Sequence, residues 1–486
     1  MRLVTFAAIV AIYLALPNVY PRFMSPNELS RLRLTRALVE HRSFQIDPYI
    51  VNPSPRTVSD VAYYRGHFYS DKAAGMSLAA VPVVAALRLV APDASLVTML
   101  LTVRFCVVVV PAMVVLWFLL KRCRTSYAFL SVIGLFLGSV VITQTLNFSG
   151  HVLATIVICC AAVLAGRGQP SDTRIAMSGL FAGAATLIDF TSAIAAAGLL
   201  IVVSVRARFL KKPALFAVSC AAIASVQLLV NALCFDGPFD FAYHHMFNPA
   251  DQANRGAGFF GLAVPRLDAI TGLTVGGLKG MFVHSPFLIL SVPALFFVAR
   301  RRRDPLALWA VAMCFAYFWL NASLKDWEGG WSLGPRYLLV IYPLLVYLFV
   351  QWVEDEATER SRKFLYAALV STVAWSVLLH LTAMVTWPMP PNSTFFSFPA
   401  LEIPAFLLFQ NAFAPNVLEW MGVPAVIAAS IVVMLGLAVI IVTGGLRSVP
   451  YVLIVTLLFT MVIARAAPQD GERIRRFHVF LRYMGS

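Results

Sequence analysis

Long apolar stretches alternate with short polar connections along most of the 486-residue chain. Runs of about 18 apolar residues or more are typical of helices that cross a bilayer. The pattern predicts thirteen spans, at residues 3–20, 97–120, 126–145, 150–166, 175–188, 191–205, 214–235, 281–299, 305–321, 337–353, 364–386, 423–443 and 450–464. A transmembrane β-barrel would instead show alternating segments of about ten residues, and the sequence contains none. We therefore predict an all-α, polytopic helical membrane protein.

The composition agrees with this pattern. Hydrophobic residues make up 60% of the chain and charged residues 13%, and the mean hydropathy is +0.80. A soluble domain carries about 25% charged residues. The net charge of +15 does not indicate nucleic-acid binding, because many basic residues gather in short clusters between spans. The positive-inside rule places such clusters in the cytoplasm; they occupy residues 121–124, 167–174, 206–212, 300–303 and 360–363.

One shorter apolar run, Met76–Val90, decides the predicted topology. If this run crossed the membrane, every basic cluster would lie outside. The run is short for a span and contains a proline and an arginine, so we place it as a helix at the outer surface. This predicts an N-terminus inside, a C-terminus outside and a large external first loop at residues 21–96 with juxtamembrane helices. The transmembrane domain then covers residues 1–465, and a short basic tail covers 466–486.

The external first loop contains the most suggestive polar residues. Ser25-Pro26-Asn27-Glu28 fits a capping box, in which Glu28 stabilises the start of a helix. The same carboxylate, partly desolvated at the membrane boundary, could instead act as a general base. Lys72 lies directly before the surface helix, where a lysine can bind phosphate together with free N–H groups. A local pair between Lys72 and Asp71 is the alternative, and Asp60 and Asp71 are candidate substrate contacts.

Later segments add candidates from predicted external turns. In Glu328–Tyr337, Trp331 suits the membrane interface and Arg336 could bind a phosphate with two hydrogen bonds. An interfacial anchor is the simpler explanation of that segment. The other candidates are polar residues for which a structural role is the alternative: His151, Tyr243, His244 and Lys279.

Several chemistries lack a signal in the sequence. There is no P-loop and no dinucleotide fingerprint, so ATP coupling and nucleotide-sugar donors are not expected. The seven cysteines show neither metal-ligand spacing nor a disulfide framework. Adjacent histidines at 244 and 245 cannot share one helical face, so a divalent metal is at most a weak prediction. Few charged residues lie deep in the spans (Arg104 and Asp189), whereas an ion-coupled transporter usually has more of them near the middle of the membrane.

Five segments in order carry a family resemblance. SPNELSRL, FQID, GHFYSDKAAG, HSPFLILSVPAL and GGWSLGPRY resemble segments of bacterial integral-membrane proteins similar to dolichyl- or polyprenyl-phosphate-mannose–protein mannosyltransferases. These belong to the GT-C glycosyltransferases, which include the protein O-mannosyltransferases and the lipid A aminoarabinose transferases. The likeness covers most of residues 1–350.

The resemblance implies a membrane glycosyltransferase that takes a sugar from a polyprenyl-phosphate donor, with inversion, on the outer face of the bacterial inner membrane. The acceptor would be a hydroxyl on a glycan, lipid or protein. By resemblance, Glu28 is the general base that activates it, and we expect Lys72, Arg336 and Lys279 to bind the donor phosphate. Family members usually have Asp-Glu where this chain has Asn27-Glu28, so a metal-assisted reaction lacks one carboxylate.

Two other functions remain open at this point. A lipid-linked sugar flippase could use the same basic residues without forming a glycosidic bond. A non-catalytic, lipid-binding envelope subunit could retain the lipid without turnover. The acidic residue just past the first span favours the transferase, because a flippase has no need of it.

Overall fold

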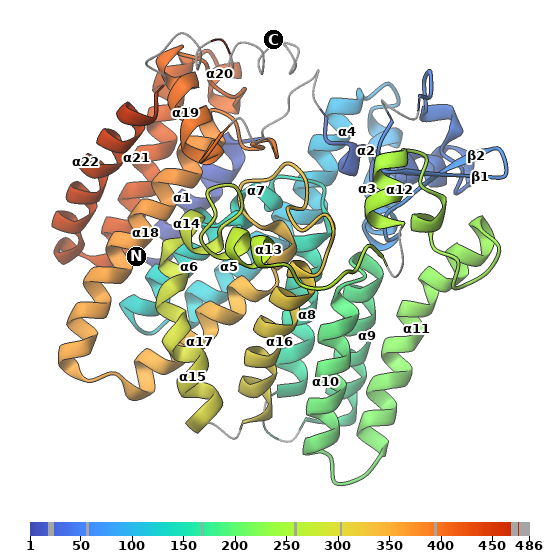
Figure 1. The fold of residues 1–486 in the computed structure, drawn as a ribbon, viewed down its shortest axis with the longest axis horizontal. Coiled ribbons are helices and arrows are strands. Elements are labelled where there is room, and N and C mark those ends of the chain that lie inside the picture. Colours follow the sequence, from blue (N-terminus) through green and yellow to red (C-terminus); the bar gives the residue numbers. More distant parts are fainter. Residues whose placement is uncertain are drawn as a thin grey trace.

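The computed structural model describes residues 1–17, 24–54, 58–166, 168, 170–256, 260–301, 304–392, 396–467 and 475. Within these residues the protein is mostly helical, with one two-stranded sheet. Figure 1 shows most helices standing side by side in a bundle, with short helices and the sheet gathered at one end. The all-α prediction is confirmed.

Each predicted span coincides with one helix or with consecutive helices. The bundle consists of α1 (Arg2–Ala15), α4 (Leu96–Val103), π-helix η3 (Arg104–Val109), α5 (Val110–Arg122), α6 (Ser126–Leu137), α7 (Val140–Thr145), α8 (Gly150–Gly166), α9 (Asp172–Ile188), α10 (Ser192–Arg206), α11 (Lys211–Cys234), α14 (Met281–His284), η5 (Pro286–Ser291), α15 (Val292–Arg301), α16 (Pro305–Ala322), η6 (Arg336–Leu338), α17 (Ile341–Glu356), α18 (Glu359–Val385), α21 (Ala425–Gly444) and α22 (Val449–Ala466). In the described part of the chain, six helical segments are long and apolar enough to cross a membrane, and the others are shorter.

Contacts between connections support the predicted grouping of the basic clusters. Arg2 donates to the Cys123 carbonyl at 2.9 Å, and the Tyr127 hydroxyl donates to the Arg362 carbonyl at 2.6 Å. Arg206, at the end of α10, donates to the Gly166 carbonyl at 2.7 Å. Figure 1 shows the α10–α11 and α17–α18 connections at the lower end.

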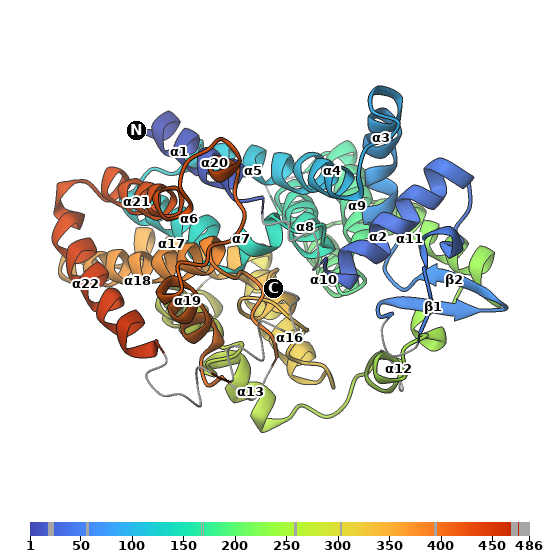
Figure 2. The same cartoon turned by 90° about the horizontal axis from the view of Figure 1, so that it is seen from above.

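The opposite end carries a small polar cap built mainly from the first loop. Strands β1 (Val61–Tyr64) and β2 (His67–Ser70) pair antiparallel, with Val61 opposite Ser70 and Tyr64 opposite His67. Both turn residues between them, an arginine and a glycine, have positive φ, as a two-residue hairpin of this hand requires. Figure 2 shows the hairpin at one edge of the bundle, beside α2 (Pro26–Arg36) and α12 (Pro249–Arg255). The other short helices are π-helix η1 (Ala37–His41), η2 (Asp47–Tyr49), η4 (Ala242–His245), α13 (Leu267–Thr274), α19 (Pro399–Phe409), α20 (Val417–Trp420) and η7 (Leu446–Ser448).

The predicted surface helix is α3 (Gly75–Val90), which joins the cap to the bundle. A Cβ atom at Gly75 would lie 2.6 Å from the Leu187 carbonyl oxygen, so α3 begins where only glycine allows close packing on the end of α9. Ser77 donates to the Arg31 carbonyl at 3.0 Å and fixes α2 against α3. The first loop is therefore a folded unit seated on the ends of the spans. Most of the tail at 466–486 lies outside the described residues.

Candidate functional site

A cluster of buried charges lies where the cap meets the bundle. The Lys72 ammonium lies 2.7 Å from Asp60 Oδ1 and 2.7 Å from Asp71 Oδ2. The Arg255 guanidinium reaches Asp60 Oδ1 at 2.6 Å and Asp326 Oδ2 at 3.5 Å. Five residues from three separate segments of the chain thus form one ion network, as expected for buried charges, which need partners.

The hairpin explains why two of these carboxylates meet. Asp60 precedes β1 and Asp71 follows β2, and the Val61–Ser70 pair beside them is the last of the ladder. Residues flanking such a pair lie opposite each other. Ser30 from α2 donates to Asp71 at 3.2 Å and contacts the Ser70 hydroxyl at 2.8 Å. Hairpin and helix together therefore fix Asp71.

The network keeps Asp60 ionised. Burial acts to raise the pKa of Asp60, but the Lys72 ammonium and the Arg255 guanidinium outweigh it and hold that pKa well below its usual range. The neighbouring Asp251 has no such cation at hydrogen-bond distance among the described residues, and burial raises its pKa. The positive charges of Lys72 and Arg255 are thus largely balanced by aspartates.

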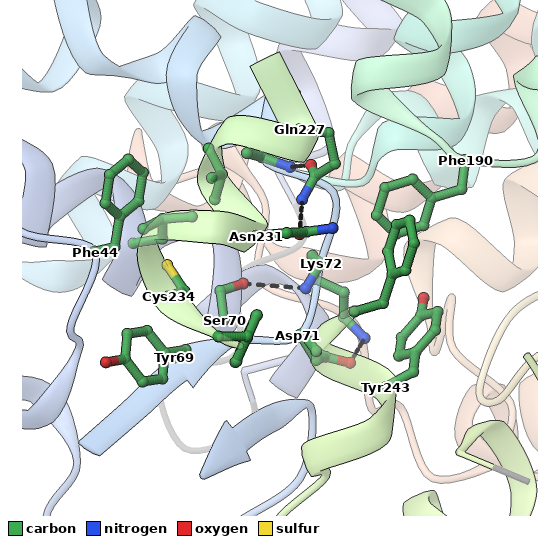
Figure 3. Close-up of a pocket in the computed structure, with 16 residues that line it drawn as sticks. Phe44, Tyr69, Ser70, Asp71, Lys72, Phe190, Gln227, Asn231, Cys234 and Tyr243 are labelled. Atoms are coloured by element: carbon green, nitrogen blue, oxygen red, sulfur yellow. Dashed lines mark hydrogen bonds and ion pairs between the residues drawn. The ribbon is translucent and has the colours of Figure 1, made fainter. Parts of the chain in front are cut away.

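A small pocket opens beside this network. Its lining includes the polar residues Asp71, Lys72 and Tyr243 and the aromatic residues Phe190 and Phe241. Figure 3 shows Lys72 and Tyr243 directed toward the same part of the pocket. The pocket lining therefore combines polar and apolar groups.

A second polar group lies at the neighbouring ends of three bundle segments. His151, the second residue of α8, lies with Nδ1 2.7 Å from Asp189 Oδ2, just past α9. The other Asp189 oxygen accepts from the Thr191 backbone N–H at 3.1 Å and hydroxyl at 2.8 Å. The Tyr337 ring, from η6, lies 5.6 Å from the imidazole. Burial alone would raise the pKa of Asp189, but its hydrogen bonds, first that from His151, lower it to about 2.

Two guanidinium groups beside His151 lack a carboxylate partner within the described residues. Arg31 donates to the Asn27 carbonyl at 3.0 Å and to the Asn27 side chain, and it makes no ion pair there. Arg336 likewise makes no ion pair with a described residue. The Nε atom of each is buried and has no hydrogen-bond acceptor in the described structure. Both charges lie within electrostatic range of His151. An anion between these groups would supply the missing acceptors.

The structure gives Glu28 a different environment from the expected one. Its side chain is 1% exposed and accepts two hydrogen bonds from Arg104, at 2.8 and 2.6 Å, and one from the Phe148 backbone. Ser25 is the N-cap of α2 but makes no side-chain capping bond, so the capping box is also absent. We expected Glu28, Lys72 and Arg336 to surround one phosphate. The structure corrects this expectation for Glu28, because Arg104 binds both oxygens of its carboxylate.

Lys279 is also oriented differently from the prediction. It is fully buried, and its ammonium donates to the carbonyls of Gly330 and Ser332, each at 2.8 Å, and to the Ser332 hydroxyl at 3.1 Å. Burial, assisted by the nearby Arg336 charge, lowers the pKa of Lys279 to about 7. Lys279 thus holds the loop that contains Trp331 rather than facing a ligand.

Lys279 makes stability depend on pH in a defined direction. Its folded-state pKa of about 7 lies below the ordinary 10.5, so between these values the unfolded chain holds a proton that the folded protein lacks. Stability therefore rises with pH in this window, by up to about 1.4 kcal/mol per pH unit, and the gain is lost as pH falls to 7. Unfolding midpoints in detergent should rise more steeply with pH for wild type than for Lys279→Met, with exposed Lys325→Met as control. Equal slopes for wild type and Lys279→Met would contradict this.

The remaining predicted residues divide between the pocket and the surface. Tyr243 lines the pocket. His244 is exposed and bonds Asp240 at 3.1 Å, beside His245, which bonds the same carboxylate at 2.8 Å. The structure therefore does not bring His244 into the site. Among the described residues, no three histidine, cysteine or acidic side chains are grouped as metal ligands.

Sequence reasoning missed Arg31, Arg255, Asp326 and Tyr337 as site residues. Arg31 lies four residues after Asn27 on the same helical face, and Tyr337 directly follows Arg336, so both could have been found from their motifs. Arg255 ends α12 outside any motif, and the sequence carried no signal for it.

Comparison with known proteins identifies the fold. No family model matches the chain, and no curated protein matches it. The crystal structure of ArnT from Cupriavidus metallidurans in the apo state matches with a TM-score of 0.54 and 15% identity, over 95% of this chain and 77% of that chain. The same protein bound to undecaprenyl phosphate matches with a TM-score of 0.52 and 14% identity, over 92% and 77%. The chain therefore shares the fold of ArnT, and the predicted GT-C-like fold of a polytopic helical membrane protein is confirmed.

Proposed function

We propose that this protein transfers a sugar from a polyprenyl-phosphate carrier to a hydroxyl group of an acceptor glycan, lipid or protein. One observation carries the proposal: Arg31 and Arg336, two guanidiniums without carboxylate partners in the described structure, both act on His151. The partner of His151 is Asp189, which directly precedes Phe190, a residue in the lining of the half-apolar pocket. A phosphate on a prenyl chain has the matching chemistry. A protein with this fold was crystallised with undecaprenyl phosphate, which supports the same lipid class here.

The reaction needs the phosphate to leave the anomeric carbon. Arg31 and Arg336 would hold the phosphate oxygens through paired N–H donors. Lys72 would stabilise the charge that grows as the carbon–oxygen bond breaks, by turning from Asp60 or Asp71 toward the phosphate. The freed carboxylates, with Tyr243 and Trp331, would contact sugar hydroxyls. Attack from the face opposite the phosphate would invert the anomeric carbon.

The basic clusters support the expected orientation. Their described residues lie at the bundle end opposite the cap, and clusters of this kind remain in the cytoplasm. The site would then face the non-cytoplasmic side of the bacterial inner membrane.

Undecaprenyl phosphate tests the site independently of the sugar. In detergent, we expect it to raise the unfolding midpoint, by an amount equivalent to about 2.7 kcal/mol at 100 times its dissociation constant, whereas undecaprenol should have no effect. With undecaprenyl-phosphate-linked sugars in proteoliposomes, mass spectrometry should detect released undecaprenyl phosphate. Transport of the intact donor without release would identify a flippase, and binding without release from any donor a non-catalytic subunit.

A further inference from the structure

We propose that His151, oriented by Asp189, is the base that takes the proton from the acceptor hydroxyl. The inference rests on the proposed transferase function and names a group that this function requires. His151 Nδ1 lies 2.7 Å from Asp189 Oδ2, while Nε2 has no hydrogen-bond partner among the described residues. The imidazole side chain remains 16% exposed. One nitrogen is thus fixed and the other is available.

The Asp189 carboxylate is fixed by its own hydrogen bonds, as a group that orients a histidine must be. Its second oxygen accepts two hydrogen bonds from Thr191. The Thr191 carbonyl in turn accepts from the Tyr317 hydroxyl, at 2.9 Å. Because both oxygens have fixed partners, the carboxylate keeps the Nδ1 proton in place and leaves the Nε2 lone pair free. A carboxylate that orients histidine in this way also stabilises the imidazolium formed by proton transfer.

The dyad lies beside the site proposed for the phosphate. Phe190 directly follows Asp189 and lines the pocket together with Lys72; its ring centroid lies 6.3 Å from that of Tyr243. The charges that reach His151 are those of Asp189, Arg336 and Arg31. The two guanidiniums favour a neutral imidazole before transfer, and Asp189 favours the charged form after it.

The carboxylates expected to serve as base are occupied. Arg104 and the Phe148 N–H take both oxygens of Glu28. Lys72 and Arg255 neutralise Asp60, and Asp71 accepts from Lys72 and Ser30. By contrast, His151 Nε2 does not have to break an existing hydrogen bond among the described residues before it accepts a proton.

The step balances as a single displacement. The acceptor O–H gives its proton to His151 Nε2 while its oxygen forms a bond to the anomeric carbon. The bond from that carbon to the phosphate oxygen breaks, and its electron pair leaves with the polyprenyl phosphate. The proton on Nε2 then passes to solvent or to the released phosphate.

The variant His151→Gln tests whether His151 accepts the proton or only helps to bind the substrate. We expect the rate of undecaprenyl phosphate release to fall at least about 100-fold, with affinity for undecaprenyl phosphate changed less than about threefold. The low-pH limb of the wild-type rate profile should disappear in this variant. Lys279, whose pKa burial lowers to about 7, is unchanged in His151→Gln, so loss of the limb in this variant assigns it to the histidine. Azide, a nucleophile with no proton to lose, should restore transfer as glycosyl azide.

A second histidine–aspartate pair provides the control. His67 Nδ1 lies 3.4 Å from Asp47 on the exposed hairpin, so His67→Gln should leave the rate unchanged. A wild-type rate in His151→Gln, or a weakened affinity with an unchanged maximal rate, would overturn the proposal. A wild-type protein that neither binds nor releases undecaprenyl phosphate would instead remove the proposed function.

A readout without turnover keeps the inference testable for any donor. Diethyl pyrocarbonate acylates neutral, accessible imidazole nitrogens. Peptide mass spectrometry should find His151 modified and protected by undecaprenyl phosphate, whereas buried His380 should stay unmodified. Absence of modification at His151, or modification unaffected by the lipid, would contradict an available Nε2 at this site.

Discussion

Glu28→Gln is expected to prevent the protein from folding stably in the membrane rather than to yield a folded, inactive enzyme. The substitution leaves the Arg104 guanidinium buried without its charge partner. Breaking a buried ion pair from one side costs about 3–5 kcal/mol, against a total stability of about 5–15 kcal/mol for typical domains. We expect a low monodisperse fraction after detergent extraction and a strongly lowered unfolding midpoint.

A double variant separates structure from chemistry at this pair. Glu28→Leu with Arg104→Leu removes both charges and should recover most of the folded protein, because paired apolar replacements of buried ion pairs are often neutral. If it also releases undecaprenyl phosphate, Glu28 is not the base; folded but inactive protein would return Glu28 to that role. Glu40→Gln is the matched control, since Glu40 pairs with Arg36 and Arg88 nearer the surface and should cost far less.

The bundle was predictable because a bilayer imposes a simple rule on sequence. Apolar runs located the helices of the bundle within a few residues, and the run at Met76–Val90 was correctly expected to be a helix. The Glu28–Arg104 pair was not predictable. Glu28 was identified as unusual and Arg104 as a charge within a span, but nothing in a single sequence links two residues 76 positions apart.

The site was predicted only in part, for a related reason. The hairpin has two strands of four residues each, too short to produce a clear alternating pattern. Without that hairpin, the meeting of Asp60 with Asp71 and Lys72 cannot be foreseen. Arg336 and Tyr243 were identified from local motifs and do lie at the site. Arg255 enters through an isolated short helix, so only tertiary structure brings it there.

Lys72→Met is expected to abolish release of undecaprenyl phosphate. The ammonium is the only cation at 2.7 Å from both Asp60 and Asp71 within the described residues. In the proposed reaction it also stabilises the departing phosphate, and losing one such preorganised donor costs about 100- to 1,000-fold in rate. The remaining carboxylates, left with Arg255 alone, should further destabilise the cap by about 3–5 kcal/mol. We therefore expect no measurable turnover and a lower unfolding midpoint.

The two effects can be separated by restoring the charge balance. Lys72→Met with Asp71→Asn removes one charge of each sign, so the unfolding midpoint should return most of the way to wild type. Turnover should not return, because the asparagine cannot replace a cation beside the leaving phosphate. Exposed Lys211, which pairs with Asp172 far from the cap, supplies the control, and Lys211→Met should leave both quantities unchanged. If the balanced double variant turned over at the wild-type rate, Lys72 would be a structural residue, and Arg31 and Arg336 alone would bind the phosphate.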